Sequence, residues 1–68
     1  MLVEAQFSFQ TLTSEQRERT ERIRVAAKHL AQTIVDCTES CADRAAAIRK
    51  VREAMMTANA SIAVEGTS

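Results

Sequence analysis

Three residues have side chains that together suit a nucleotide: Phe9, Arg24 and Lys28. The planar guanidinium of an arginine donates paired hydrogen bonds to a phosphate, and an aromatic ring offers a flat surface on which a base can stack. Arg24 and Lys28 are four residues apart, so a helix would place them on one face. In the alternative interpretation Phe9 is a hydrophobic staple packed on the next helix, and Arg24 is solvated. On residue types alone this second interpretation is the more common one.

Met56 and Asn59 are secondary candidates for ligand contacts. They form one helical stripe with Arg52 and Ala63, and this stripe runs beside an apolar seam. An asparagine in that position either fixes the register of an oligomer or reaches a ligand. Methionine among alanines is more often part of a core, because it fills irregular gaps between closely packed helices.

The sequence lacks the combinations of side chains on which most enzymes depend. It contains no paired carboxylates placed for acid–base work, no nucleophile beside a base and no glycine-rich phosphate loop. The single histidine, His29, has no acid on its helical face to orient it, so we expect an exposed helix residue. With Cys37 and Cys41 it makes three potential zinc ligands, one fewer than a structural site needs. We predict a protein that is not an enzyme and has no metal and no cofactor.

Cys37 and Cys41 are four residues apart across a predicted turn. This spacing differs from the two intervening residues of a redox pair, and no signal peptide precedes them. We therefore expect two reduced, partly buried thiols in a cytoplasmic protein. No apolar run approaches the ~20 residues of a membrane span, so no contact with a membrane is predicted.

Two apolar seams define the elements that must carry these side chains. Each seam steps by threes and fours, which is the spacing of a helix, and a short polar break separates them. The sequence therefore predicts an all-α fold, in which two long antiparallel helices form a helical hairpin. The seams consist of Ile23, Ala27, Leu30, Ile34 and Cys37, and of Ile48, Val51, Met55, Ala58 and Ile62.

Capping signals set the expected ends of the helices. Thr13 and Gln16 have the spacing of a capping box, and Ser40 with Asp43 offers a second capping signal. We expect helices at about 14–36 and 41–63, within a hairpin domain of residues 13–63. Residues 1–12 are predicted to form an N-terminal segment that packs on the hairpin. Residues 64–68 contain the only glycine and are predicted to fray.

A hairpin of this size is too small to cover both apolar seams. Chains of about 60 residues bury only about 60% of their unfolded surface, so assembly of several copies into a bundle is the expected remedy. The net charge of zero argues against a long nucleic acid as the partner. All nine Lys and Arg residues fall between Arg17 and Arg52, together with five acidic residues, and this basic window suits a small anionic ligand.

Three segments together resemble the phage anti-CBASS cyclic-nucleotide sponges, a helical-hairpin family shared with anti-Thoeris sponges. The segments are Phe9-x-x-Leu12-Thr13-x-Glu15-Gln16, the helix from Glu21 to Ala31, and the stretch from Arg52 to Ala63. The resemblance implies a homohexamer in the cytoplasm of an infected bacterial host. It also implies that the protein sequesters cyclic di- and trinucleotide messengers of CBASS immunity without catalysis.

The resemblance assigns roles to two residues. The family presents an aromatic residue, often tyrosine, in a Y/F-x-x-L segment and a basic residue on the following helix, and these positions are Phe9 and Arg24 here. Lys28, Met56 and Asn59 join them as predicted ligand contacts, from their helical positions alone. A trinucleotide site is in doubt, because Ala60 stands where an arginine is expected.

Other functions stay open at this level. The chain can be an oligomerisation or adaptor module whose outer helices bind a protein partner, or a sponge for cyclic ADP-ribose signals. A small transcriptional regulator ranks below both, because glutamates dilute the basic window and the helix-turn-helix geometry is poor.

Overall fold

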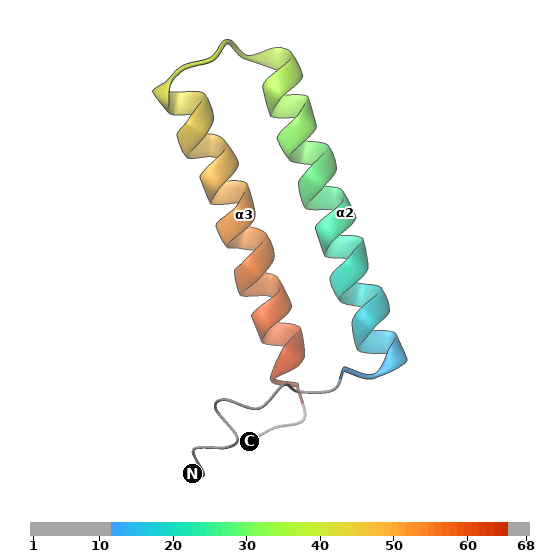
Figure 1. The fold of residues 1–68 in the computed structure, drawn as a ribbon. Coiled ribbons are helices and arrows are strands. Elements are labelled where there is room, and N and C mark those ends of the chain that lie inside the picture. Colours follow the sequence, from blue (N-terminus) through green and yellow to red (C-terminus); the bar gives the residue numbers. More distant parts are fainter. Residues whose placement is uncertain (1–11, 66–68) are drawn as a thin grey trace.

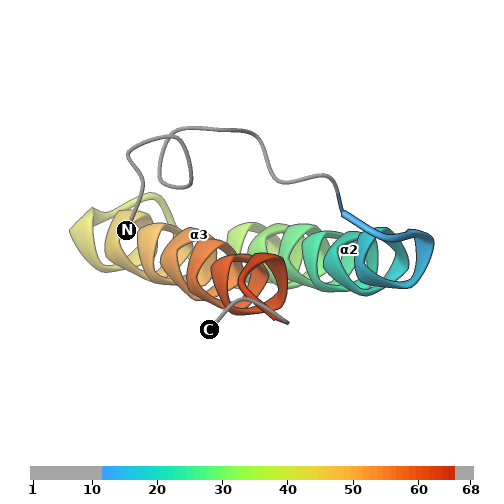
Figure 2. The ribbon, with the colours of Figure 1, turned by 90° about the horizontal axis from the view of Figure 1, so that it is seen from below.

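The computed structural model describes residues 12–65, and most of them lie in two helices. Helix α2 spans Ser14–Cys37 and helix α3 spans Ala42–Ala63, and the two run antiparallel with one short connection (Figure 1). Seen from below, they lie side by side in a single layer (Figure 2). The predicted all-helical hairpin is confirmed, and the described residues contain no strand. The predicted N-terminal segment lies outside the described residues except for Leu12.

Helix α2 begins at the predicted capping box. The backbone N–H of Gln16 donates to Thr13 Oγ1 at 3.1 Å, and Gln16 Oε1 accepts from the N–H of Thr13 at 3.0 Å. The same amide group reaches the other helix, because Gln16 Nε2 donates to the carbonyl oxygen of Ile62 at 3.2 Å. Carbonyls in the last turn of a helix have no helical partner. One glutamine side chain therefore satisfies the start of α2 and the end of α3.

The connection between the helices corrects one prediction and shows how α2 ends. The N-cap of α3 is Cys41, with an extended backbone and no side-chain hydrogen bond, so the predicted cap at Ser40 is wrong. Ser40 lies one residue too early for its hydroxyl to occupy the capping position. Arg44 Nη2 on α3 donates to the carbonyl oxygen of Val35 at 2.6 Å. This bond satisfies one of the free carbonyls of α2 and ties the two helices together beside the connection.

Both cysteines lie at this end of the hairpin. Cys37 and Cys41 are free thiols, as predicted, but both are exposed, so the expected partial burial is wrong. Only two helix ends meet at the connection, and no third element of the described chain covers them. His29 is exposed on α2, as its sequence context indicated.

The contact between the helices follows the predicted seam on α3 and a shifted seam on α2. Ile62 is the one buried side chain among the described residues, at 6% exposure, and the other α3 seam residues are half-buried. On α2, Leu30 is 50% exposed and Cys37 is exposed, so their placement in the seam is wrong. Ala31, a half-buried residue, lies where Leu30 was expected, because its small side chain lets the helices approach closely. Within residues 12–65, neither helix has an apolar stretch long enough to cross a bilayer.

Val64 and Glu65 are held at the end of α3. The N–H of Val64 donates to the carbonyl oxygen of Ala60 at 3.2 Å, and the N–H of Glu65 donates to that of Ile62 at 3.1 Å. These bonds join the first two residues of the segment predicted to fray to the last turn of α3, and the fraying itself stays a prediction. The rest of that segment, residues 66–68, lies outside the described residues.

Candidate functional site

Two adjoining hollows form a groove along one face of the hairpin, between α2 and α3. Their volumes are about 530 and about 330 Å³, and Arg24 lines both. We name this surface the basic groove. The first hollow includes Leu12, Thr20, Glu21, Arg24, Met56 and Asn59, and the second includes Arg24, Lys28, Ala31, Ile48, Arg52 and Met55.

The basic groove contains four of the five residues that the sequence proposed as ligand contacts. Arg24, Met56 and Asn59 meet in the first hollow, and Lys28 lines the second. Phe9 lies outside the described residues. Leu12, three positions later in the sequence, lines the first hollow.

Helical geometry explains why these side chains converge. Arg24 and Lys28 are one turn apart on α2, a spacing that puts the two Cβ atoms about 5–6 Å apart. Because the helices are antiparallel, Arg24 shares a hollow with Met56, and Lys28 shares the next hollow with Arg52. The groove thus has two levels, and each level receives residues from both helices.

The cations of the basic groove are weakly neutralised. Arg24 forms an ion pair with Glu21 on its own helix, and these side chains are 65% and 53% exposed. An ion pair this exposed contributes little to stability, so an incoming anion can replace it. Lys28 and Arg52 have no hydrogen bond or ion pair within residues 12–65. The groove can therefore offer positive charge from both helices to a ligand.

Asn59 places an amide group in the first hollow. Its Oδ1 atom is buried and accepts no hydrogen bond from the described part of the chain. A buried acceptor without a donor costs free energy, and most such groups in folded proteins have a partner. Because the chain itself covers this oxygen, a donor from outside can reach it only after the Asn59 side chain turns towards the hollow.

Arg52 is the groove residue that the site prediction left out. Its position is four residues before Met56 and seven before Asn59, so the sequence already placed it in their stripe. The sequence does not show which residue of α2 lies opposite. The pairing of the helices places Arg52 and Lys28 in the same hollow.

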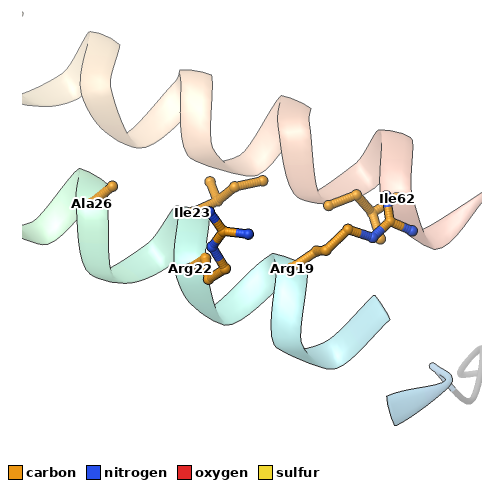
Figure 3. A pocket seen from close by; sticks show the side chains of 5 residues that line it. All are labelled: Arg19, Arg22, Ile23, Ala26 and Ile62. Carbon is orange, nitrogen blue, oxygen red and sulfur yellow. The ribbon is translucent and has the colours of Figure 1, made fainter. Parts of the chain in front are cut away.

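The opposite face has a groove of different chemistry. One hollow of about 400 Å³ is lined by Arg19, Arg22, Ile23, Ala26 and Ile62, with the Arg19 side chain extending from α2 towards Ile62 on α3 (Figure 3). A second hollow of about 510 Å³ shares Ile23 and Ala26 with the first. Apart from Lys50, it is lined by apolar side chains, including Leu30. We name these two hollows the apolar groove.

In the apolar groove Arg19 is neutralised by the chain itself. Its Nη1 atom donates to Glu65 Oε2 at 2.9 Å, its Nη2 atom contacts the other carboxylate oxygen, and its Nε atom lies 2.7 Å from Glu15 Oε1. The hydrogen bonds from Arg19 hold the pKa of Glu65 below its ordinary value. The same bonds raise the pKa of Arg19. This arginine is therefore occupied, whereas Lys28 and Arg52 in the basic groove have no ion pair within residues 12–65.

Comparison with known families gives one match. The family model described as "Acb2/Tad1, hairpin domain" matches residues 1–63, which includes both helices and the segment with Phe9. The match confirms the resemblance to anti-CBASS and anti-Thoeris sponges. Neither a curated protein nor a solved structure matches the chain. The described residues contain no cluster of three or more side chains able to hold a metal ion.

Proposed function

This chain belongs to the Acb2/Tad1 hairpin-domain family, and we propose that it acts as a phage sponge for cyclic oligonucleotide messengers of bacterial CBASS defence. Members of the family are sponge-type binding proteins and not enzymes. The proposed role is to bind the messenger in the cytoplasm of the infected cell and keep it from its effector. Cyclic dinucleotides are the proposed ligands, with cyclic trinucleotides as a second class.

The observation that carries this proposal is the convergence of Arg24, Met56 and Asn59 in one hollow. A cyclic dinucleotide presents phosphodiester anions and flat bases. Arg24 suits the phosphate, because a guanidinium donates two parallel hydrogen bonds to it. Met56 is 59% exposed and offers an adaptable apolar contact for a base. The Asn59 oxygen can accept from an exocyclic amine once its side chain turns towards the hollow.

We assign the base-stacking role to Phe9. It precedes Leu12 by three residues, and Leu12 lines the hollow that contains Arg24. An aromatic side chain stacks on any base, since every base has a π-face, at about 1–3 kcal/mol per base. A phenylalanine has no hydroxyl, so the polar contact that a tyrosine makes in other family members is lost here.

A homo-oligomer, and for this family a hexamer, is part of the proposal. The hairpin leaves Leu30 half-exposed in the apolar groove, and Ile62 is the only buried side chain among the described residues. A second copy packed on that groove would cover it. A pocket between two copies encloses more of a ligand than the open basic groove of one hairpin can.

Calorimetry with a panel of cyclic dinucleotides, cyclic trinucleotides and cyclic ADP-ribose tests the proposal. We expect binding of at least one cyclic dinucleotide, and we expect the ligand to be recovered chemically unchanged after denaturation of the protein. Ligand at a hundred times its dissociation constant should stabilise the protein by about 2.7 kcal/mol, which a thermal melt detects. No binding to any cyclic oligonucleotide at micromolar protein would overturn the proposal.

Two alternatives give different results in the same panel. A sponge for cyclic ADP-ribose signals would bind only that ligand. An adaptor module would bind none of them, and its apolar groove would be the site for a partner protein. Light scattering of the purified chain also distinguishes the adaptor from the sponge, because an adaptor with a free groove is expected to have a lower mass than the proposed oligomer.

A further inference from the structure

The second hollow of the basic groove combines a mostly apolar lining with cations from both helices. Lys28 from α2 and Arg52 from α3 line it together, and no acidic residue lines it. The first hollow differs, because Glu21 lines it beside Arg24. Lys28 and Arg52 also have no hydrogen bond or ion pair within residues 12–65.

Lys28 and Arg52 are both exposed, so solvent and salt screen the repulsion between them in the empty protein. A bound anion is attracted to both. Lys28 and Arg52 thus form the kind of pair that a phosphate stabilises.

The spacing along α2 relates this position to the first hollow. Arg24 and Lys28 are one helical turn apart, with Cβ atoms about 5–6 Å from each other, and Arg24 borders both hollows. A ligand whose two phosphates are held apart in one ring can therefore occupy both levels at once. A ligand with one phosphate can engage only one level.

We propose that Lys28 and Arg52 form a second phosphate position, and that the groove selects ligands with two phosphodiester groups over those with one. This inference rests on the proposed function, and it deepens that function by adding Arg52 as a ligand contact and as a determinant of specificity. Arg52 acts from α3, so both helices supply cations to one ligand.

The test compares cyclic di-adenosine monophosphate with adenylyl-adenosine, a linear dinucleoside monophosphate that has the same bases and one phosphate fewer. Competition against a labelled cyclic dinucleotide gives both affinities, for the wild type and for Arg52→Gln. We expect Arg52→Gln to weaken the cyclic dinucleotide roughly tenfold or more, the effect of one charged hydrogen bond, and to change the linear ligand less than twofold.

Two further variants separate charge from structure. Lys50→Gln removes the same charge from the same helix, but Lys50 lines the apolar groove, so we expect both affinities to stay within twofold of the wild type. Arg52→Lys keeps a cation and should recover part of the lost affinity. The ligand-free melting temperature of Arg52→Gln should stay close to that of the wild type, because Arg52 is exposed and the substitution removes no hydrogen bond or ion pair within residues 12–65.

The outcomes also distinguish this inference from the proposed function. If the wild type binds the cyclic dinucleotide and Arg52→Gln binds it equally well, the second phosphate position is wrong and the proposed function stands. An equal loss for both ligands, or a lower melting temperature without ligand, would make Arg52 a structural residue and overturn the inference. If the wild type binds no cyclic oligonucleotide, both proposals fail.

Discussion

The two faces of the hairpin have three basic residues each, but they differ in what surrounds these charges. In the basic groove, Arg24 alone is paired, through one exposed contact with Glu21. In the apolar groove, Arg19 is paired with both Glu15 and Glu65, and the lining beyond Arg19, Arg22 and Lys50 is apolar. Arg22 and Lys50 are also unpaired within residues 12–65, but they line separate hollows, whereas Lys28 and Arg52 line the same one. Exposed apolar surface, for its part, often marks a site that a partner covers. The comparison supports the proposal that the first face binds a ligand and that the second packs on another copy of the chain.

The largest expected effect comes from the apolar groove. Leu30 is 50% exposed and lines it, whereas Val25 is 57% exposed on the outer side of α2. If a second copy covers Leu30, then Leu30→Ala should cost about 2–5 kcal/mol, as in a core. Val25→Ala should stay within about 0.5 kcal/mol. Denaturation at several protein concentrations measures both, and equal small effects would show that the apolar groove stays uncovered.

A second contrast concerns the arginines on opposite faces of α2. Arg24→Gln should weaken cyclic dinucleotide binding about 10- to 150-fold, the range for a hydrogen bond to a charged group, and leave the oligomer intact. Arg22→Gln removes the same charge from the apolar groove and should change affinity less than twofold. Calorimetry gives the affinities and light scattering gives the mass. Loss of the oligomer in the Arg24 variant would instead assign that residue to assembly.

How much of this difference between the faces the sequence predicts depends on how far apart in the chain the contacting residues are. The capping box of Thr13 and Gln16 spans four residues, and local patterns predict such contacts. The seam of α2 was predicted only in part, because Leu30 and Ala31 are both one turn from Ala27 and periodicity does not choose between them. The choice depends on how α2 is rotated about its own axis relative to α3. The small side chains at the contact set this rotation.

The sequence predicted those groups of site residues that lie together on one helix. The stripes with Arg24 and Lys28 and with Met56 and Asn59 follow from helical spacing. The pairing of Lys28 with Arg52 across the groove was not predictable, since it depends on the register of two antiparallel helices. The ion pair between Arg19 and Glu65 joins residues 46 positions apart and was missed for the same reason.

The charge on Glu65 gives a pH-dependent test of the difference between the faces. The pKa of Glu65 is held below its ordinary value of 4.5, chiefly by hydrogen bonds from Arg19. A carboxylate with a lowered folded-state pKa stabilises the fold above its unfolded pKa, and this contribution is lost as the pH falls through the folded-state value. Thermal melts of the wild type and of Glu65→Gln should therefore differ at pH 7, and the difference should shrink as the pH falls below the ordinary value of 4.5. A constant difference across this range would exclude the ion pair as its source.

The smallest expected effect comes from Glu21, the ion-pair partner of Arg24. Glu21 is paired with this arginine and lines the same hollow, so it competes with the phosphate and adds negative charge beside it. Exposed ion pairs contribute little, and the equivalent change in affinity is about 1.4- to 5-fold. Glu21→Gln should therefore tighten binding by that factor, whereas Glu18→Gln, which removes an acid from the outer side of α2, should change it less. Weaker binding by Glu21→Gln would mean that the carboxylate orients Arg24 for the ligand. In that case the ion pair with Glu21 would hold the cation of the first hollow in place, and the cations of the second hollow would lack such a partner.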